Sequence, residues 1–399
     1  MSSVMAPLSK FAEINPESIN GSYSHDEIEY TDISSVGSGY LIDPPQVLSL
    51  KEAPSRAKRI VRHGDTILAT VRPNLRSFLF IKSPEDNSIV STGFAVLRAK
   101  EKVEPRYIYY AITENGFTQY LINNTKGTSY PAVDSDTILR GEIPNYDFQT
   151  QRRIVTILSA YDDLIENNRR RIQLLEQAAR LLYKEWFVHL RFPGHEHVKI
   201  KDGVPAGWKK RKIADICETA GGGTPSTNVS EYWDGDITWI VPTDVTKNNC
   251  LVLLSSERKI TEKGLRESSA KIVPANTILM TSRASVGFFA LMDQEVCTNQ
   301  GFINIIPHDD ELRMYLLHNL ISRVSEIRGN AKGSTYPEIS KGRFREMDIV
   351  VPSKPLIEAF ADFTENLIRQ IRCIKKQNVG LEAARNMLLP RLMNGEIAV

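Results

Sequence analysis

Apolar residues and one asparagine follow a heptad pattern through the middle of the chain. They recur in alternating steps of four and three, at Ile154, Leu158, Tyr161, Ile165, Asn168, Ile172, Leu175, Ala179, Leu182 and Trp186. A seam of this kind, sustained over several heptads, is typical of a coiled-coil helix. At 1.5 Å per residue, a helix of about 36 residues spans roughly 54 Å.

A second helix with the same frame is predicted at the end of the chain. Moving each seam position on by 206 residues gives a series with three polar interruptions, namely Phe360, Thr364, Leu367, Ile371, Ile374, Asn378, Leu381, Arg385, Leu388 and Leu392. Pro144 and Pro352, each followed by a short polar stretch, fit the start regions of the two helices. We therefore expect two long helices that pair as an antiparallel coiled coil and act as a spacer.

Two asparagines in these seams indicate how the helices align. If Ile154 lies opposite Leu392 in an antiparallel pair, then Asn168 faces Asn378, because Asn168 lies 14 residues after Ile154 and Asn378 lies 14 residues before Leu392. A buried Asn at a core position fixes the register of a coiled coil at a cost in stability. We hypothesise that the two amides hydrogen-bond across the seam. The alternative is that each Asn lies at a solvated edge of the seam.

The chain repeats itself once, at a spacing of about 206 residues. Four sets of residues recur in the same order, at offsets of 205 to 211 residues. They are 126–131 with 332–337, 66–72 with 277–283, 93–94 with 301–302, and the Leu-Glu and Ala-Ala-Arg segments of 175–180 with those of 381–385. Together they indicate two copies of one unit, with a period too long for a solenoid.

Each copy combines a mixed globular domain with a helix. Short apolar, β-branched runs predict strands, at 66–71, 77–81 and 94–97 in the first copy and at 237–241, 277–280 and 288–292 in the second. Turn residues separate these runs. We predict an α/β (α+β) protein, internally duplicated, with a first globular domain at 1–148, a first spacer helix at 149–192, a second globular domain at 193–352 and a second spacer helix at 353–399.

Composition limits the class of protein. Apolar residues make up 41% of the chain and charged residues 25%, which is ordinary for globular proteins, and no stretch approaches the roughly 20 apolar residues of a membrane helix. The N-terminus lacks the pattern of a secretory signal. Four cysteines without a Cys-x-x-Cys pair fit reduced thiols in the cytoplasm. The formal net charge of +2 is compatible with DNA binding if basic groups gather on one face.

Several segments resemble the specificity (S) subunits of type I restriction–modification enzymes, over essentially the whole chain. They are 28–37 and 64–68 in the first copy, 205–208, 223–226 and 232–237 in the second, and 388–397, which is similar to the family's terminal helix. The first copy departs from the pattern, because it lacks the Gly-Trp opening found at Gly207 and Trp208. We therefore expect the N-terminal edge of the first domain to be built differently.

The resemblance implies a DNA-recognition subunit that is not itself an enzyme. Two target-recognition domains would each read one half of a bipartite, gapped site in double-stranded DNA. The helices would set the gap and dock two modification (methyltransferase) subunits, and restriction subunits would translocate and cut. S-adenosylmethionine, ATP and Mg would be held by these partners, so this chain is expected to bind no cofactor. A rigid spacer suits such a role, because one face of DNA recurs about every 34 Å.

Sequence motifs of enzymes are missing or incomplete. The glycines 221–223 lack the Lys of a phosphate-binding loop, and we interpret them as a flexible loop. Asp43-Pro44-Pro45 is similar to a methyltransferase motif but is followed by Gln46 instead of an aromatic residue, so we interpret it as a turn. His195 and His197 have no Cys or third ligand nearby, which favours an exposed linker over a metal site.

Candidate base-reading residues carry paired donors and acceptors, since Arg suits guanine and Asn or Gln suits adenine. They are Arg72, Asn74 and Arg76 in the first domain, and Thr224, Arg283, Ser285, Asn299 and Gln300 in the second. The alternative for each Arg is a solvated surface charge. On the matched spacings, Arg283 and Ser285 are the counterparts of Arg72 and Asn74.

The repeated Lys-Gly-Thr/Ser-Ser/Thr-Tyr-Pro loops offer a cation, hydroxyls and an aromatic ring, which suit phosphate contacts. The residues assigned to this role are Lys126, Thr128, Ser129, Tyr130, Lys332, Ser334, Thr335 and Tyr336. Alternatively, the Tyr-Pro pair packs each domain onto its helix. The run Arg169-Arg170-Arg171 either faces DNA phosphates or forms a solvated helix face.

Two other classes of function remain open from the residues alone. One is a non-catalytic coiled-coil adaptor whose domains bind protein or RNA, and the other is a degenerate methyltransferase. Strongly salt-dependent binding to duplex DNA would favour the specificity subunit over the adaptor, because phosphate neutralisation releases counterions. Binding of a cofactor by the isolated chain would favour the methyltransferase.

Overall fold

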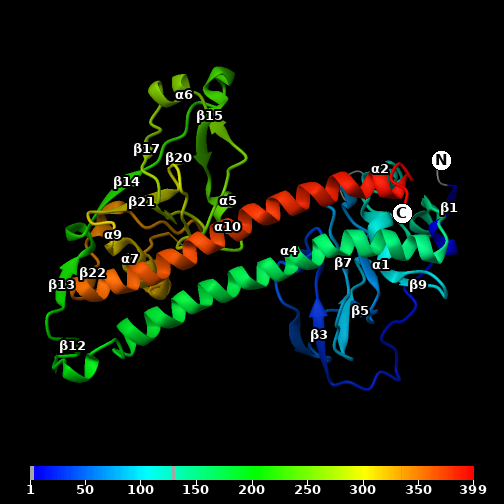
Figure 1. Cartoon of the computed structure of the whole chain (residues 1–399), viewed down its shortest axis with the longest axis horizontal. Coiled ribbons are helices and arrows are strands. Elements are labelled where there is room, and N and C mark those ends of the chain that lie inside the picture. Colours follow the sequence, from blue (N-terminus) through cyan, green and yellow to red (C-terminus); the bar gives the residue numbers. More distant parts are fainter. Residues whose placement is uncertain (1–3, 128–130, 334) are drawn as a thin grey trace. The chain divides into compact units, whose positions relative to one another are not determined.

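The computed structural model describes residues 4–127, 131–333 and 335–399. The chain divides into two compact units, Met1–Ile165 with Gly380–Val399, and Glu166–Val379. Two long helices, α4 (Phe148–Tyr183) and α10 (Lys354–Met393), each contribute one part to both units (Figure 1). In the described part of the chain, no helix is apolar over enough length to cross a membrane.

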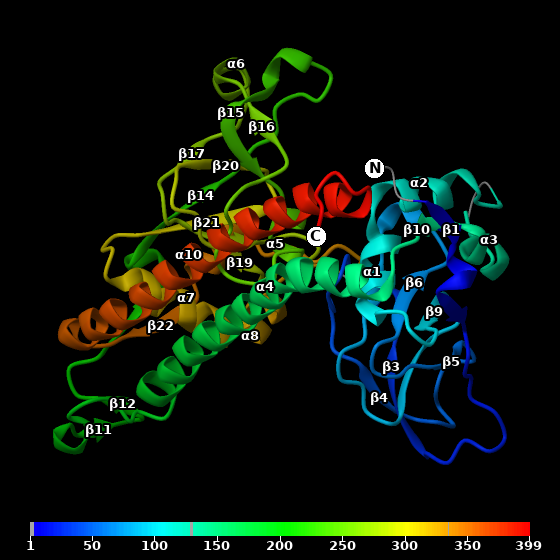
Figure 2. The same ribbon diagram turned by 45° about the vertical axis from the view of Figure 1, so that its right-hand side comes forward.

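The first globular domain contains two four-stranded sheets, drawn in blue and cyan in Figure 2. Their strand orders are β2-β9-β6-β7 and β4-β3-β8-β5, and β1 pairs antiparallel with β10. The strands are β1 (Met5–Pro7), β2 (Ala12–Ile14), β3 (Glu27–Thr31), β4 (Gln46–Ser49), β5 (Ala57–Ile60), β6 (Thr66–Ala69), β7 (Phe78–Phe80), β8 (Ser88–Ser91), β9 (Phe94–Ala99) and β10 (Glu142–Pro144). The helices are α1 (Pro105–Thr113), α2 (Asn115–Asn123) and α3 (Ser135–Arg140).

The second globular domain has sheets in the orders β14-β21-β18-β19 and β16-β15-β20-β17, an antiparallel pair β13-β22 and a hairpin β11-β12. The strands are β11 (Ile200–Lys201), β12 (Val204–Pro205), β13 (Lys209–Lys212), β14 (Cys217–Gly221), β15 (Trp233–Ile240), β16 (Lys259–Ile260), β17 (Ile272–Val273), β18 (Ile278–Thr281), β19 (Phe289–Ala290), β20 (Val296–Thr298), β21 (Phe302–Pro307) and β22 (Asp348–Val351). The helices are α5 (Pro242–Thr246), α6 (Glu262–Arg266), α7 (Leu312–Ser322), α8 (Val324–Gly329) and α9 (Lys341–Arg345).

The predicted duplication is confirmed by the connections of the strands. Each domain has one four-stranded sheet with only antiparallel pairs and one that contains a parallel pair, β3 with β8 in the first domain and β15 with β20 in the second. A buried tyrosine also recurs. The Tyr107 hydroxyl donates to the Pro144 carbonyl at 2.6 Å, and the Tyr315 hydroxyl donates to the Val350 carbonyl. The two copies therefore share their topology and a side-chain contact that fastens helix to edge strand.

The prediction that the N-terminal edge of the first domain is built differently is wrong for its strand pairing. β1 pairs with β10 just as β13 pairs with β22. Trp208 instead packs against Phe187 and Phe192, which follow α4. The Gly-Trp opening therefore belongs to the connection between the first long helix and the second domain, and not to the domain edge.

The two long helices pair antiparallel within each unit. In the first unit Asp162 contacts Arg385, and the Tyr146 hydroxyl just before α4 donates to the Met393 carbonyl. In the second unit Asn168 contacts Asn378, and Tyr183, further along α4, contacts Phe360, which lies earlier in α10. Every predicted seam residue is buried or half-buried, so the predicted coiled-coil frame is confirmed except at the end of α4.

Each of the three polar residues in the second seam has a partner. The Thr364 hydroxyl donates to the Phe360 carbonyl at 2.7 Å within α10. Arg385 forms an ion pair with Asp162 at 2.6 Å. The Nδ2 of Asn168 donates to the Oδ1 of Asn378 at 2.8 Å, with exposed fractions of 1% and 8%. The hypothesis of an amide pair across the seam is thus confirmed, and its burial excludes a solvated edge.

The seam shifts by one residue where α4 ends. A π-helical turn, Lys184–Val188, follows α4, and an extra residue per turn rotates the side chains that come after it. Tyr183 and Phe187 are buried here, whereas the predicted Leu182 and Trp186 are only half-buried. The heptad frame is therefore wrong by one position at this end, beginning at Tyr183, the last residue before the π-helical turn.

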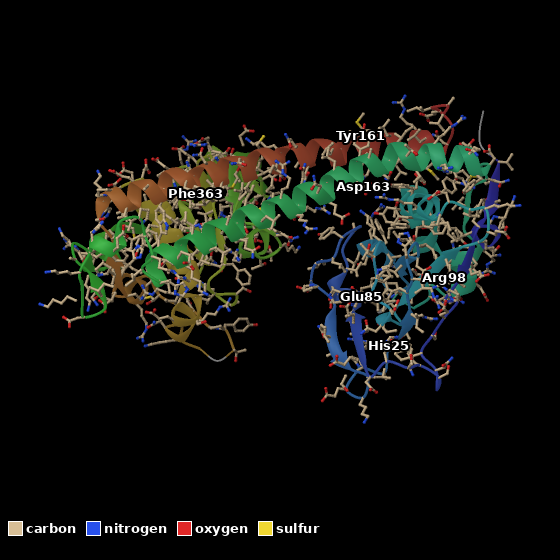
Figure 3. All side chains as sticks on the ribbon, turned by 60° about the horizontal axis from the view of Figure 1, so that its bottom comes forward. His25, Glu85, Arg98, Tyr161, Asp163 and Phe363 are labelled. Atoms are coloured by element: carbon tan, nitrogen blue, oxygen red, sulfur yellow. The ribbon has the colours of Figure 1, made fainter. Side chains whose placement is uncertain are left out.

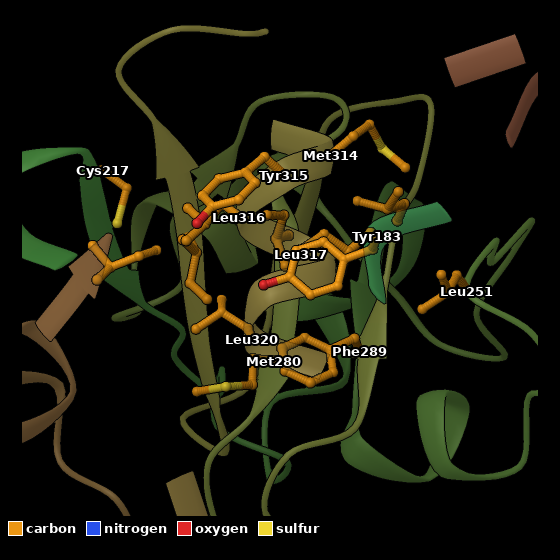
Figure 4. Close-up of a cluster of buried hydrophobic side chains, with 14 of the residues drawn as sticks. Tyr183, Cys217, Leu251, Met280, Phe289, Met314, Tyr315, Leu316, Leu317 and Leu320 are labelled. Atoms are coloured by element: carbon orange, nitrogen blue, oxygen red, sulfur yellow. The ribbon is translucent and has the colours of Figure 1, made fainter. Parts of the chain in front are cut away.

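Each unit has its own apolar core, to which both long helices contribute. In the first unit Leu158 and Leu392 pack with the side chains of α1. In the second unit α7 lies at the centre, with Met314, Leu316 and Leu317 among the buried residues drawn in Figure 4. Because both helices bury residues in each core, burial of apolar surface fixes each globular domain to the helix pair.

Candidate nucleic-acid interface

Three loops of the first domain meet around the candidate residues that follow β6. The Gly39 N–H donates to the Phe78 carbonyl at 2.9 Å, and the Ser38 hydroxyl donates to the Arg76 carbonyl at 2.8 Å. The Arg72 N–H donates to the Pro131 carbonyl at 2.8 Å. Loop 37–42, turn 72–76 and the repeated Lys-Gly loop therefore lie side by side, although they are far apart in the sequence.

Turn 72–76 has an unusual backbone. Arg72 and Arg76 have positive φ angles of 49° and 54°, a conformation that is uncommon for residues other than glycine. The Arg76 guanidinium donates to the Thr113 carbonyl at 2.6 Å and to the Asn115 side chain at 2.8 Å. Arg76 therefore anchors the turn to α1 and α2, and these two bonds occupy donors that a guanine contact would require.

The second domain gathers its candidate residues in the same way. The Thr224 hydroxyl donates to the Gln300 Oε1 at 2.5 Å, and the Gly301 N–H donates to the Asn299 Oδ1 at 2.9 Å. The Ser282 N–H donates to the Gly301 carbonyl at 2.7 Å. The residues predicted from separate motifs thus form one surface. The hydrogen bonds of Asn299 and Gln300 use their oxygens and leave amide hydrogens for other acceptors.

The Gly-rich segment 221–223 is packed tightly, so its interpretation as a flexible loop is wrong. Gly221 ends strand β14, and the Gly223 N–H donates to the Thr298 carbonyl at 2.9 Å. A Cβ on Gly222 would lie 2.1 Å from the Thr298 carbonyl oxygen. The buried Trp239 indole donates to the Gly223 carbonyl at 2.9 Å. These glycines allow backbones to approach closely and hold Thr224 in place.

Backbone hydrogen bonds correct the pairing of the two turns by one residue. The Ala284 N–H donates to the Pro337 carbonyl at 2.9 Å, as the Arg72 N–H donates to Pro131, and the two prolines match in the sequence repeat. The structural counterpart of Arg72 is therefore Ala284, not Arg283. Ala284 has a φ of 57°, so the left-handed position is kept while the side chain is not.

Arg283 lies beside the second turn and is held by an ion pair. Its Nε lies 2.7 Å from the Glu338 Oε1, and both side chains are about half exposed. The pair fixes the direction of the guanidinium and leaves its terminal nitrogens for another acceptor. Glu338 was not predicted from the sequence, because a lone Glu after the repeated Tyr-Pro carries no signal of its own.

The repeated Lys-Gly loops differ in charge. The Lys126 Nζ forms an ion pair with Asp134 at 2.7 Å, and this contact, together with hydrogen bonds from Thr137, lowers the pKa of Asp134. At the matching position the second copy has Ser340, which caps α9. Lys332 is exposed and has no carboxylate partner among the described residues. Tyr336 is 77% exposed, so it does not pack the second domain onto its helix.

Part of the predicted phosphate-binding set cannot be placed. Thr128, Ser129, Tyr130 and Ser334 lie outside the described residues. Thr335 is exposed, and so is Ser285, a base-reading candidate on the second turn. The described members of the set thus lie at the surface, beside the base-reading candidates of the same domain.

An acidic pair on α4 fastens the first domain to the helices. The Tyr110 hydroxyl donates to the Asp162 Oδ2 at 2.6 Å, and the Arg385 guanidinium donates to its Oδ1 at 2.6 Å. Asp163, labelled in Figure 3, pairs with Arg106 at 2.9 Å and Lys82 at 3.0 Å. Burial alone would raise the pKa of Asp163, but these hydrogen bonds keep it below its usual value. Asp162 therefore joins α1, α4 and α10.

The second domain is fastened through the loop before β16. Glu176 of α4 accepts a hydrogen bond from the Leu251 N–H at 2.5 Å, and burial raises the pKa of this carboxyl. Lys375 of α10 donates to the Val252 carbonyl and the Asn248 side chain, both at 2.7 Å. The two helices therefore hold this loop from two directions.

A buried histidine also lies between the second domain and the helices. His318 of α7 is 1% exposed and packs against the rings of Tyr183 and Phe360. Neither ring nitrogen has a hydrogen-bond partner among the described residues. Burial, with a contribution from Arg180, lowers the pKa of His318 to about 4. The helix at the matching place in the first domain, α1, contains no histidine.

A second charged cluster stabilises the sheet below the first turn. Arg98, labelled in Figure 3, contacts both oxygens of Asp65 at 2.8 Å and also pairs with Glu17. Asp65 is 1% exposed and belongs to one of the segments that resemble the family. A bidentate, buried pair of this kind orders the start of β6, so Asp65 has a structural role.

The described residues contain no group of three His, Cys, Asp or Glu side chains that could hold a metal ion. His195 and His197 lie on an exposed turn, and Glu196 is the carboxylate within 4 Å of each among the described residues. Asp43 lies in a bend before β4. Arg170 and Arg171 are exposed on α4, whereas Arg169 is half-buried.

A family model matches most of the chain. The model is described as the type I restriction modification DNA specificity domain, and it matches twice, at residues 15–177 and 205–383. Each match contains one globular domain and most of the long helix that follows it. The two matches therefore coincide with the two structural copies.

Individual proteins give the same result. The chain is 24% identical to the type I restriction enzyme HindI specificity subunit of Haemophilus influenzae, over 88% of this chain and 90% of that protein. It is 38% identical to the MjaIX specificity subunit of Methanocaldococcus jannaschii, over 47% and 45% of the two chains. The crystal structure of a type I restriction–modification S subunit from M. genitalium superposes with a TM-score of 0.59 at 13% identity, covering 98% of this chain and 96% of that one. This last likeness supports the fold.

Proposed function

This chain belongs to the family of type I restriction–modification DNA specificity subunits, and we propose that it directs adenine methylation and restriction to a bipartite DNA site with an unspecified gap. DNA target recognition is the function of the family. The duplication is the observation that supports recognition of a site with two halves, since each copy of the domain gathers its own base-reading candidates around one turn. Two readers that differ in side chains would read two different half-sites.

The roles within each surface follow from chemistry. Asn74, Arg283, Asn299 and Gln300 contact base edges, because their donors and acceptors match those of the major groove. Lys332 and the exposed hydroxyls of its loop contact phosphates, which position the domain without reading sequence. Arg72 is exposed beside Asn74 and takes either role, whereas Arg76 holds the turn.

The partners in this proposal are duplex DNA, two modification subunits and the restriction subunits. The helix pair sets the gap length and carries the modification subunits. The chain itself is non-catalytic and binds no cofactor. S-adenosylmethionine, ATP and Mg act on the partner subunits, in the cytoplasm, where the four free cysteines stay reduced.

Methylation mapping tests this function. The chain is co-expressed with its modification subunit in a host that lacks adenine methylation, and modified adenines are located across the genome by single-molecule sequencing. The proposal predicts one motif with two specified halves separated by a gap of fixed length. A single uninterrupted motif would contradict the bipartite role, and co-purification without any methylation of DNA would contradict the directing role.

Loss of the modification subunit during purification would favour the adaptor function instead. A salt titration of binding to duplex DNA separates the two functions, because counterion release makes the affinity of a DNA reader fall steeply with salt. An adaptor for protein would show no such dependence on DNA.

A further inference from the structure

The turn that carries base-reading candidates is one residue longer in the first domain than in the second, and this changes which side chains are exposed. The Ala69 N–H donates to the Ser77 carbonyl, and the Thr281 N–H donates to the Phe288 carbonyl, both at 2.9 Å. These equivalent bonds close a turn of seven residues, 70–76, in the first domain and one of six, 282–287, in the second. The first turn therefore has one residue more between the same two strands.

The extra residue places a leucine at the surface. Leu75 is 61% exposed, and Asn74 beside it is also exposed. The second turn instead tucks Val286 into the apolar core, where it is 3% exposed. An apolar side chain in the second turn thus contributes to packing, whereas Leu75 contributes little. A single exposed apolar side chain is ordinary on a protein surface, but Leu75 lies directly beside the base-reading candidate Asn74, so a ligand bound to Asn74 would be within its reach.

The first turn is rigid enough to present these two side chains in a fixed direction. A short 3₁₀ turn, Pro73–Leu75, lies between the left-handed residues Arg72 and Arg76. Pro73 fixes its own φ, the Arg72 N–H is bonded to Pro131, and the Arg76 guanidinium is bonded to α1 and α2. A strained backbone kept by several independent contacts is typical of a functional loop.

We propose that Asn74 and Leu75 together read one A·T base pair in the half-site of the first domain. The Asn74 amide donates to N7 and accepts from N6 of the adenine, and Leu75 contacts the C5-methyl group of the thymine. In the major groove adenine offers these two groups to Asn or Gln, and only thymine carries a methyl group. The inference rests on the proposed function, since it names the base pair that this surface recognises.

Replacement of thymine by deoxyuridine tests the methyl contact. The half-site of the first domain is the half that changes when Arg72 or Asn74 is replaced. In duplexes with the mapped site, each thymine of that half is replaced in turn by deoxyuridine, which removes one methyl group. The complex with wild-type chain should lose about fourfold in affinity at one thymine, the factor that corresponds to burial of one methyl group. The Leu75→Ala complex should bind the thymine duplex and the deoxyuridine duplex equally at that position. In methylation mapping, Asn74→Ala should relax the motif at the same base pair.

Matched variants separate this role from a structural one. Leu75→Ala should leave thermal unfolding unchanged, because the side chain is exposed, whereas Val286→Ala should lower the midpoint without changing any base preference. Leu75→Met should retain sensitivity to deoxyuridine. Equal sensitivity of the wild-type and Leu75→Ala complexes, or none in either, would overturn the inference while methylation of the mapped site still supported the proposed function. Absence of any methylated motif would overturn both.

Discussion

The two recognition domains share a framework but differ in how they are fastened and in what they display. In the first domain Asp162 links α1 to both helices through charged and hydroxyl groups, and a seven-residue turn exposes Leu75. In the second domain a buried histidine lies against the helices, and a shorter turn buries Val286. Duplication thus preserves strand order and backbone hydrogen bonds, while the length and side chains of one turn change freely. A reader of two different half-sites requires this combination.

Removal of the Asp162 contacts that link the first domain to the helices should have the largest effect on stability. Asp162→Ala leaves Arg385 and the Tyr110 hydroxyl without their shared acceptor in a largely buried place, which should cost about 3 kcal/mol of stability. Hydrogen–deuterium exchange should rise in α1 and in the first half of α4 while the second domain keeps its protection. Asp163→Ala is the control, since its side chain is more exposed and the loss should be smaller. Equal protection in both variants would contradict the role of Asp162.

Between pH 7 and pH 5, the main effect of acid should fall on the second domain. The pKa of His318, about 4, lies below its usual value because of burial, so its contribution to stability is present above pH 6.5 and is lost as the pH falls towards 4. The free energy of unfolding should fall by roughly 2 kcal/mol between pH 7 and pH 5. His318→Leu should remove most of this dependence, measured by urea unfolding at each pH. The exposed His197→Leu serves as control, and an unchanged pH profile in His318→Leu would contradict the assignment.

The amide pair in the seam should have a smaller effect that depends on how it is changed. Asn168→Ala removes the hydrogen bond that the Oδ1 of Asn378 accepts in a buried place, and this should cost about 1.5 kcal/mol. The double variant Asn168→Leu with Asn378→Leu should be at least as stable as wild type. If the pair fixes register, mapped motifs of the double variant should show more than one gap length. A single gap, identical to that of wild type, would limit the pair to a structural role.

The charged loops should differ slightly in their contribution to DNA affinity. Lys332→Ala should lower the slope of log affinity against log salt by about one, as expected for one lost phosphate contact. Lys126→Ala should lower it less, because Asp134 already neutralises that ammonium group. Binding to a duplex measured from low to moderate salt distinguishes the two. A larger change for Lys126 would reverse this part of the comparison.

Long-range patterns in the sequence predicted the framework well. The heptad seam, the facing of Asn168 with Asn378 and the strands after Thr66 and Thr277 depend on periodicity and repetition, which a sequence displays directly. The predicted seam failed only at the end of α4, where Tyr183 and Phe187 are buried and Leu182 and Trp186 are half-buried, next to a π-helical turn. A local change of helix type leaves no periodic signal in so short a segment.

The details of the reading surfaces were harder to predict. Aligning Arg72 with Arg283 by their letters misplaced the second turn by one residue, since only backbone hydrogen bonds show where the shorter turn closes. Three glycines in a row looked flexible, yet close backbone contacts hold them. Exposure of Leu75 could not be inferred, because apolar residues are usually buried and turn length decides which way this one points.

Mapping the methylated motif for three chains side by side tests the central claim most directly. The chains are wild type, Asn74→Ala in the first domain and Arg283→Ala in the second, each in complex with the same modification subunit. The account predicts that each variant relaxes one half of a bipartite motif, that the two halves differ, and that the gap stays constant. Relaxation of the same half by both variants, or of both halves by either one, would contradict two independent readers in one chain.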